Sequence, residues 1–215
     1  MAKEPSYDEL ENQYKSLLAM HKDLEIKCQQ SEASLAQVVK QSSSPDLAVF
    51  SKSQARLIEI ETTYRNLFEN AGISIWNEDL YSLYQTLEQF RSEGVTDLRR
   101  FLKDNPEVVF DLVTKVKVLN VNKATLKLFG SGTEENFINN ISYSFGEGAM
   151  DVFVDELIAI WDKKSFICSK ANYIKTSGEK IKALISIAIP EKAEDFKSVP
   201  VTIQDITELD YKEDR

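Results

Sequence analysis

The sequence predicts an α+β domain with an antiparallel sheet and flanking helices, preceded by long N-terminal helices of the coiled-coil type. All seven glycines stand at Gly72 or later, and glycine commonly marks turns. A heptad pattern of apolar residues runs through residues 1–41. Strand-like segments follow one another in the last third of the chain. We therefore expect a helical N-terminal part and a turn-rich globular part.

The heptad pattern indicates that the first helix pairs with another helix. One position of the repeat holds Tyr7, Tyr14, His21, Cys28 and Leu35, and the other holds Leu10, Leu17, Leu24, Ser31 and Val38. An apolar stripe of this kind must be buried against a partner helix. We expect a homodimer through the N-terminal helices, with a seam formed by Leu10, Tyr14, Leu17, His21 and Leu24.

Residues 42–46 break this pattern, because small polar residues followed by Pro45 end a helix or turn the chain. A second helical pattern over residues 47–71 leads into the globular part. Its apolar positions are Phe50, Leu57, Ile60, Tyr64, Leu67 and Ala71. Two arrangements fit: the helices fold back into a hairpin, or the second continues the first after a kink.

The globular part begins with a short alternating segment, residues 73–77, which predicts a strand. Residues 79–115 read as helices, with Gly94 ending one and Pro106 in the first turn of another. A short helix is expected over residues 122–129, closed by Gly130. The remaining strands are expected at 116–121, 166–175, 181–189 and 199–204, and turn residues Thr176-Ser177-Gly178-Glu179 join the third strand to the fourth.

Composition excludes several classes of protein. The 215 residues include 26 Lys and Arg against 35 Asp and Glu, a net charge of -9, which disfavours nucleic acids and anionic membranes as partners. No apolar segment reaches the ~18 residues of a membrane span, and the N-terminus does not resemble a secretory signal. Cys28 and Cys168 indicate neither a disulfide framework nor a zinc site. We expect a cytoplasmic protein.

Three motifs, in order along the chain, resemble the PAS sensor family. The first is Tyr64-Arg65-Asn66-Leu67-Phe68-Glu69-Asn70-Ala71 followed by Ile73-Ser74-Ile75. The second is Asn122-Lys123-Ala124 with Phe129-Gly130 and then Glu134-Glu135-Asn136-Phe137. The third is Asp205-Ile206-Thr207 after the last strand. The resemblance covers about residues 60–210. It implies a PAS-like domain over 72–207 with a helical insertion at 79–115, and the start of an output helix at 208–215.

The resemblance implies a core that binds haem, flavin, a small metabolite or nothing. The single histidine, His21, lies in the N-terminal helix, which disfavours histidine-ligated haem. Cys168 lies in a predicted strand instead of the Asn-Cys-Arg-Phe helix of photoactive flavin domains, which disfavours cysteinyl-flavin. Non-covalent flavin stays open but has no positive signal in the sequence, and a small apolar metabolite or no ligand is the favoured interpretation. Residues that could line a pocket are Trp76, Phe110, Val118, Leu126, Phe129, Phe145, Trp161 and Ile187; the alternative is that they fill the core.

No catalytic constellation is recognisable, because the globular part lacks histidine and no nucleotide-binding glycine motif occurs. We predict a non-catalytic sensing and dimerisation module of a bacterial signal-transduction protein, such as a sensor histidine kinase of a two-component system. A ligand-induced or redox change in the core would pass through Asp205 and Thr207 to an output helix and a downstream output domain. The alternative is a ligand-free dimerisation or protein-interaction module.

Overall fold

The computed structural model describes residues 7–41 and 47–208, and the chain divides into two compact units between Asn70 and Ala71. The break expected at residues 42–46 lies outside the described residues, as does the output helix expected beyond Glu208. The two units are described separately.

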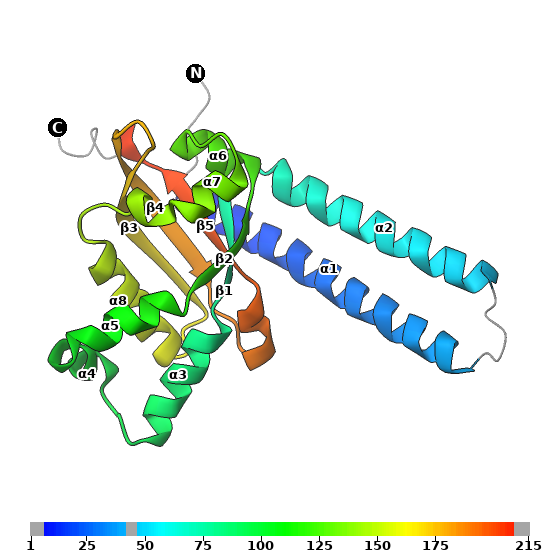
Figure 1. Ribbon diagram of the computed structural model, residues 1–215, viewed down its shortest axis with the longest axis horizontal. Helices are drawn as coiled ribbons and strands as arrows, with labels where there is room; N and C mark the ends of the chain where they lie inside the picture. Colours follow the sequence, from blue (N-terminus) through cyan, green and yellow to red (C-terminus); the bar gives the residue numbers. More distant parts are fainter. Residues whose placement is uncertain (1–6, 42–46, 209–215) are drawn as a thin grey trace. The chain divides into compact units, whose positions relative to one another are not determined.

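The first unit is a helical hairpin made of α1 (Tyr7–Gln41) and α2 (Leu47–Glu69), which lie side by side (Figure 1). The ring of His21 meets that of Tyr64 edge to face, with 5.4 Å between the ring centroids. Because His21 lies in the first half of α1 and Tyr64 near the end of α2, the helices run antiparallel. Of the two arrangements that the sequence left open, the chain therefore folds back.

Among the described side chains of the predicted stripes, Ser31 on α1 is buried and the others are half-buried. The half-buried side chains include His21, Leu24 and Cys28 on α1, and Leu57, Ile60, Tyr64 and Leu67 on α2. The side chains of Leu10, Tyr14, Leu17 and Phe50 lie outside the described residues. Burial lowers the pKa of His21, so its imidazole is neutral at pH 7. Ordinary packing against Tyr64 therefore explains the chain's single histidine.

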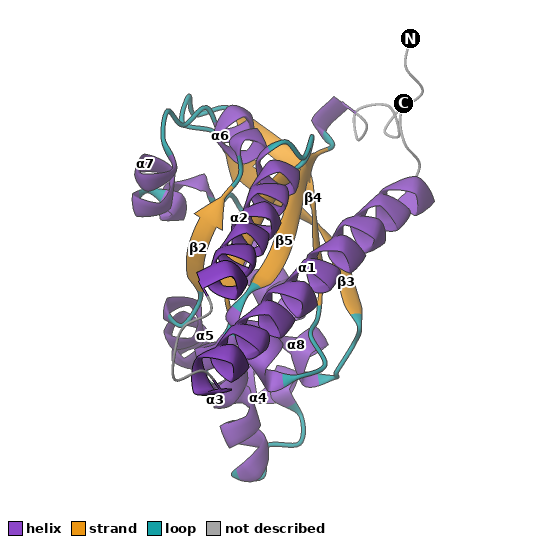
Figure 2. Ribbon diagram, turned by 90° about the vertical axis from the view of Figure 1, so that its right-hand side faces the viewer, coloured by secondary structure: helices purple, strands orange, loops and turns teal. Residues whose placement is uncertain are grey.

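The second unit contains a five-stranded antiparallel sheet in the order β2-β1-β5-β4-β3, seen as one layer in Figure 2. The strands are β1 (Ser74–Asp79), β2 (Lys117–Val121), β3 (Phe166–Ile174), β4 (Lys180–Ala188) and β5 (Val199–Asp205). Each lies within about two residues of its predicted range. The predicted α+β fold with an antiparallel sheet and flanking helices is confirmed.

The segment between β1 and β2 forms α3 (Tyr81–Ser92), α4 (Leu98–Asp104) and α5 (Pro106–Thr114). Asp97 caps α4 by accepting the backbone N–H of Arg100 at 2.9 Å, and Pro106 opens α5. Together with Leu157 and Trp161 from a later helix, these helices bury a second apolar cluster, the insertion cluster, which includes Leu83, Leu87, Leu98, Leu102, Val109 and Leu112. The insertion is thus a packed layer that a later helix completes.

Helix α8 (Ala149–Trp161) was not predicted from the sequence, although it joins the two apolar clusters of the second unit. Its Leu157 and Trp161 belong to the insertion cluster, whereas Ala159 belongs to the cluster against the sheet. Val154, Leu157, Ile158 and Trp161 follow the i, i+3, i+4, i+7 spacing that could have indicated it. The remaining helices are α6 (Lys123–Phe129), α7 (Glu134–Asn139), and the 3-10 turns η1 (Ile141–Ser144) and η2 (Ala193–Lys197).

The Asn122 side chain ties β1 to the start of α6 and is fully buried. Its Oδ1 accepts the backbone N–H groups of Ile75 at 3.1 Å and Thr125 at 3.0 Å, and its Nδ2 donates to the carbonyl of Ile73 at 2.8 Å. One amide thus acts as a helix cap and as a bridge to a strand far away in sequence. This is the asparagine of the second motif.

We expect Asn122→Ala to destabilise the second unit by about 2–4 kcal/mol, because several buried polar groups lose their partners at once. The measurement is urea denaturation followed by tryptophan fluorescence. Asn136→Ala is the control: Asn136 is exposed and its side chain accepts only from Asn140, so the loss should stay below about 0.5 kcal/mol. Equal losses in the two variants would contradict the role given to Asn122.

Candidate functional site

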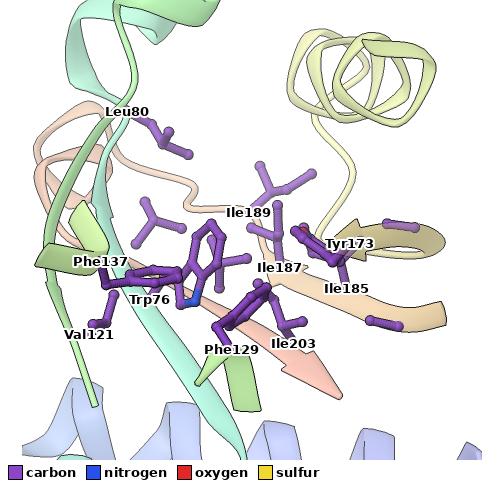
Figure 3. Packing of buried hydrophobic residues seen from close by; sticks show 14 of the residues in the cluster. Trp76, Leu80, Val121, Phe129, Phe137, Tyr173, Ile185, Ile187, Ile189 and Ile203 are labelled. Carbon is purple, nitrogen blue, oxygen red and sulfur yellow. The ribbon is translucent and has the colours of Figure 1, made fainter. Parts of the chain in front are cut away.

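The centre of the second unit is an aromatic cluster around Trp76, whose side chain is 2% exposed. Its indole lies 5.3 Å from the ring of Phe137, 5.7 Å from Phe129, 6.0 Å from Tyr173 and 6.2 Å from Phe145, between centroids. All these pairs are tilted or edge-on, the geometry that aromatic quadrupoles favour. Figure 3 shows the rings of Trp76, Phe129, Phe137 and Tyr173, which come from strands and helices that are far apart in the sequence. The indole Nε1 has no hydrogen-bond partner among the described residues.

Five of the eight pocket candidates belong to this cluster. Trp76, Phe129 and Ile187 are buried in it, and Val118 and Leu126 pack against it half-buried. Phe145 lies at its edge, 43% exposed while still contacting Trp76 and Tyr173. It is therefore the ring of the cluster that faces solvent.

Two of the pocket candidates lie elsewhere. Phe110 is 64% exposed, because α5 turns Val109 and Leu112 inward instead. Trp161 is buried, but in the insertion cluster, with the Arg91 guanidinium 4.0 Å above its ring. The eight residues thus do not surround one common space.

Two carboxyl groups and a phenol share the interior of the unit, and the sequence reading missed them. Burial raises the pKa of Glu78, on β1, to about 8. Burial, followed by the charges of Glu78 and Asp155, raises the pKa of Glu156, on α8, to about 8. The pKa of Tyr173, on β3, is also raised, by burial and then by both glutamates. Both glutamates are therefore mainly protonated at pH 7.

The position of Glu78 follows from strand geometry. Residues two apart on a strand share a face, and Glu78 lies two residues after Trp76. The register between β1 and β2 shifts between Asn77 and Glu78, a bulge of the kind that re-aims a side chain. A carboxyl two residues from an inward tryptophan is the signal that could have indicated this group, but its partner Glu156 comes from a distant helix.

The end of β5 forms a second polar site, which contains both predicted junction residues. The Asp205 carboxylate accepts the backbone N–H of Thr207 at 2.9 Å. The backbone N–H of Lys182, on β4, donates to the Thr207 hydroxyl at 3.0 Å, and the N–H of Ile206 donates to the Lys182 carbonyl at 2.8 Å. The backbone pairing of β4 with β5 ends at Ala183 and Asp205. The Thr207 hydroxyl, by binding the N–H of Lys182, extends this hydrogen-bond ladder by one residue. The Thr207 hydroxyl is thus bound to a strand.

Other candidate groups carry no evident chemistry. Cys168 is half-buried in β3 and accepts a hydrogen bond from the Ser186 hydroxyl at 3.2 Å. Within residues 7–41 and 47–208, no group of three or more histidine, cysteine or acidic side chains is arranged to hold a metal ion. None of the helices described is both long and apolar enough to cross a membrane.

The buried glutamates make stability depend on pH. Their carboxyls ionise near pH 4.5 in the unfolded chain but only near pH 8 in the folded one, so the folded state binds more protons in between. Their stabilising effect is complete below pH 4.5 and is lost as pH rises through about 8. We expect Glu78→Gln and Glu156→Gln each to reduce the fall in unfolding free energy between pH 5 and pH 8 by about 1 kcal/mol or more.

Denaturant titrations at several pH values provide the measurement. Glu191→Gln is the matched control, because Glu191 is exposed and removal of its charge should leave the pH profile unchanged. Parallel profiles for the native chain and both buried-site variants would show that these carboxyls ionise normally in the fold.

No protein-family model matches the chain, and no curated protein matches its sequence. The solved structures to which it is similar include a domain of a sensory box sensor histidine kinase/response regulator from Geobacter sulfurreducens, at 16% identity, covering 69% of this chain and 96% of that one, with a TM-score of 0.42. Another is the PAS domain of an HTR-like protein from Haloarcula marismortui, at 13% identity, with coverage of 73% and 99% and a TM-score of 0.45.

A PAS domain from a two-component sensor histidine kinase is similar at 16% identity, covering 69% of this chain and 98% of that chain, with a TM-score of 0.38. Two of these three structures are described as PAS domains, and the third as a domain of a sensory box sensor histidine kinase/response regulator. The five-stranded antiparallel sheet and its flanking helices fit the PAS fold that the three sequence motifs predict.

Proposed function

We propose that this chain is the non-catalytic sensory module of a cytoplasmic bacterial signalling protein, such as a sensor histidine kinase of a two-component system. The observation that carries the proposal is the junction at the end of β5. There, the backbone of Lys182 on β4 binds Ile206 and Thr207, and the Asp205 carboxylate accepts the backbone N–H of Thr207.

The last strand connects this junction to the aromatic core. Val201 and Ile203 of β5 are buried in the same cluster as Trp76, and Val201 pairs directly with Trp76 across the sheet. A change in the packing of the rings therefore acts on a strand that ends at Asp205 only two residues after Ile203. Signalling would be a population shift between a fastened and a released junction.

The chemistry of the cluster favours a small apolar ligand. The aromatic rings provide apolar contacts, and the half-exposed ring of Phe145 offers the way in from solvent. A ligand bearing one hydrogen-bond acceptor could also use the unpaired Nε1–H of Trp76. Binding would have to move at least one of these rings, which is how it would reach β5.

The second candidate function is a ligand-free dimerisation or protein-interaction module. The close ring contacts around Trp76 favour it, because they also describe a finished core. Under both candidate functions, the chain forms a homodimer through its N-terminal helices. Under both, it also acts on a downstream output domain.

A ligand screen combined with hydrogen exchange tests the sensory role. We expect a compound from a library of small apolar metabolites to raise the melting temperature and to change amide exchange at Ile206 and Thr207 by about threefold or more. In Asp205→Ala the melting shift should remain while the exchange response disappears, because the tie to Thr207 is lost.

Glu208→Ala serves as the control, since this exposed acidic neighbour has no role in the tie. A ligand-free mass in native mass spectrometry, together with no melting shift across the library, would favour the ligand-free module. A shift with an intact exchange response in Asp205→Ala would remove the junction from the mechanism.

The dimer is tested by light scattering coupled to size exclusion. We expect twice the chain mass for the native protein, and a monomer after Leu10→Lys and Leu17→Lys, because charges in a seam prevent its burial. Lys15→Glu, in the same helix but on an exposed side chain, should leave the dimer intact. A native protein that elutes with the mass of one chain would contradict the dimer.

A further inference from the structure

Thr176, in the turn between β3 and β4, binds the end of helix α6. Its backbone N–H donates to the Phe129 carbonyl at 2.9 Å, and its hydroxyl lies 3.1 Å from that carbonyl and 2.9 Å from the Gly130 carbonyl. The last carbonyls of a helix have no partner within the helix. Here they are bound by a residue 47 positions after Phe129 in the sequence.

The Thr176 hydroxyl lies close to the place that a side chain at Gly130 would occupy. Gly130 ends α6 in the left-handed conformation, with φ 72°. A Cβ at this position would stand 3.0 Å from the Thr176 hydroxyl oxygen. Two physical features therefore favour glycine at position 130 of the second motif: the left-handed backbone conformation and the close contact with Thr176.

Phe129 is the residue through which the contact reaches the core. Its ring is 1% exposed and lies 5.7 Å from that of Trp76 and 5.6 Å from that of Tyr173. Its carbonyl, on the same residue, is the one that Thr176 binds. A movement of the ring that displaces the Phe129 backbone must carry Thr176 with it or break these hydrogen bonds.

The turn that carries Thr176 is closed by its own contacts. Lys175 donates its backbone N–H to the Glu179 carbonyl at 2.8 Å, and its Nζ lies 2.7 Å from the Glu179 carboxylate. Gly178 donates to the Lys175 carbonyl at 2.9 Å. These contacts close a short loop.

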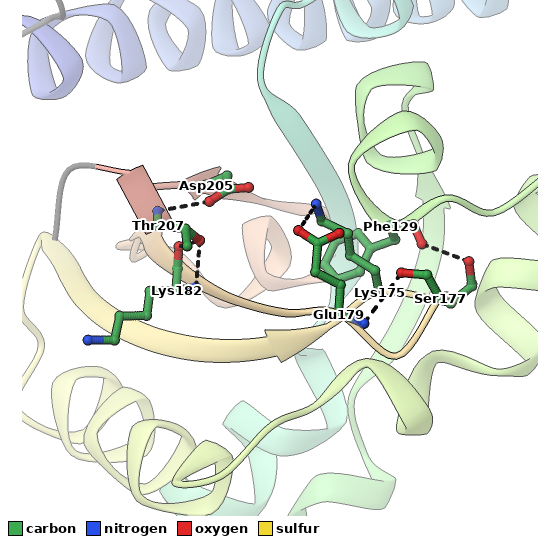
Figure 4. A network of polar contacts seen from close by, with 8 residues as sticks. Phe129, Lys175, Ser177, Glu179, Lys182, Asp205 and Thr207 are labelled. Carbon is green, nitrogen blue, oxygen red and sulfur yellow. Dashed lines mark hydrogen bonds and ion pairs between the residues drawn. The ribbon is translucent and has the colours of Figure 1, made fainter. Parts of the chain in front are cut away.

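The same turn leads directly to the junction. Strand β4 starts at Lys180, and its third residue, Lys182, holds Ile206 and Thr207. Figure 4 shows the turn and the junction along this hairpin. A hydrogen-bonded path therefore runs from the Phe129 carbonyl through the turn and β4 to the end of β5.

We propose that Thr176 is a positioning residue that couples the aromatic cluster to the Asp205–Thr207 junction. For its biological meaning the inference rests on the proposed sensory function, but the coupling is a property of the chain alone. Thr176 acts through Phe129 on one side and Lys182 on the other, and touches no ligand itself. The Thr176 hydroxyl adds a second contact to the one made by its backbone, which makes the link rigid.

Thr176→Val tests the coupling, because valine keeps the shape and the backbone N–H but removes the hydroxyl. We expect the domain to remain folded and the amide exchange of Ile206 and Thr207 to accelerate about threefold to tenfold, the effect of losing one hydrogen bond. The measurement is hydrogen exchange by NMR on the full chain without ligand. Ser177→Ala is the matched control, because the Ser177 hydroxyl accepts only the N–H of Glu179, within the turn.

A double-mutant cycle separates coupling from local loosening. Phe129→Leu should change the amide exchange rates of Ile206 and Thr207 in the native background. In the Thr176→Val background, the same substitution should change these rates at least threefold less. Unchanged exchange in Thr176→Val, an equal effect in Ser177→Ala, or additive effects in the cycle would each overturn the inference. Since no ligand enters this experiment, a failed ligand screen would overturn the proposed function without touching this result.

Discussion

The packing of rings around Trp76 is the contact on which the rest of the second unit depends. It joins β1 to α6, α7 and β3, which come from widely separated parts of the sequence. Because Trp76 on β1 pairs with Val201 on β5, the position of the indole also affects the position of this last strand. Tilted aromatic contacts have strict geometry and little free volume, so a displaced ring must move its neighbours. The core can therefore transmit a local change instead of absorbing it.

Two carboxyl groups are unusual in the interior of a core that is otherwise so apolar. Burial raises the pKa of both glutamates, the charge of Glu78 raises that of Glu156 further, and both carboxyls add to the raised pKa of Tyr173. The arrangement is tolerated at neutral pH because a protonated carboxyl costs far less to bury than a charged one. The free energy of unfolding is thus linked to proton binding at two elements, β1 through Glu78 and α8 through Glu156.

Antiparallel pairing explains why the polar contacts gather at one end of the sheet. The start of β4 lies against the end of β5, so the turn before β4 and the exit after β5 are neighbours. Thr176 binds α6 at this end, and Lys182 binds Thr207. The route proposed between core and exit uses main-chain groups almost throughout, which leaves few side chains whose loss would break it without unfolding the domain.

The sequence by itself determined most of the local structure: the five strands, the helices of the insertion, and the two ends of α6 at Asn122 and Gly130. Periodicity, turn residues and caps are local signals, and they were sufficient to predict these elements. The sequence also pointed to Trp76, Phe129, Asp205 and Thr207 as candidate functional residues. Only the tertiary structure decided the fold-back of α1 onto α2, the exposure of Phe110, the separate cluster of Trp161, and the meeting of Glu78 with Glu156. Each of these depends on which distant surfaces pack together, and a pattern within one segment shows that a face will be buried without showing what will cover it.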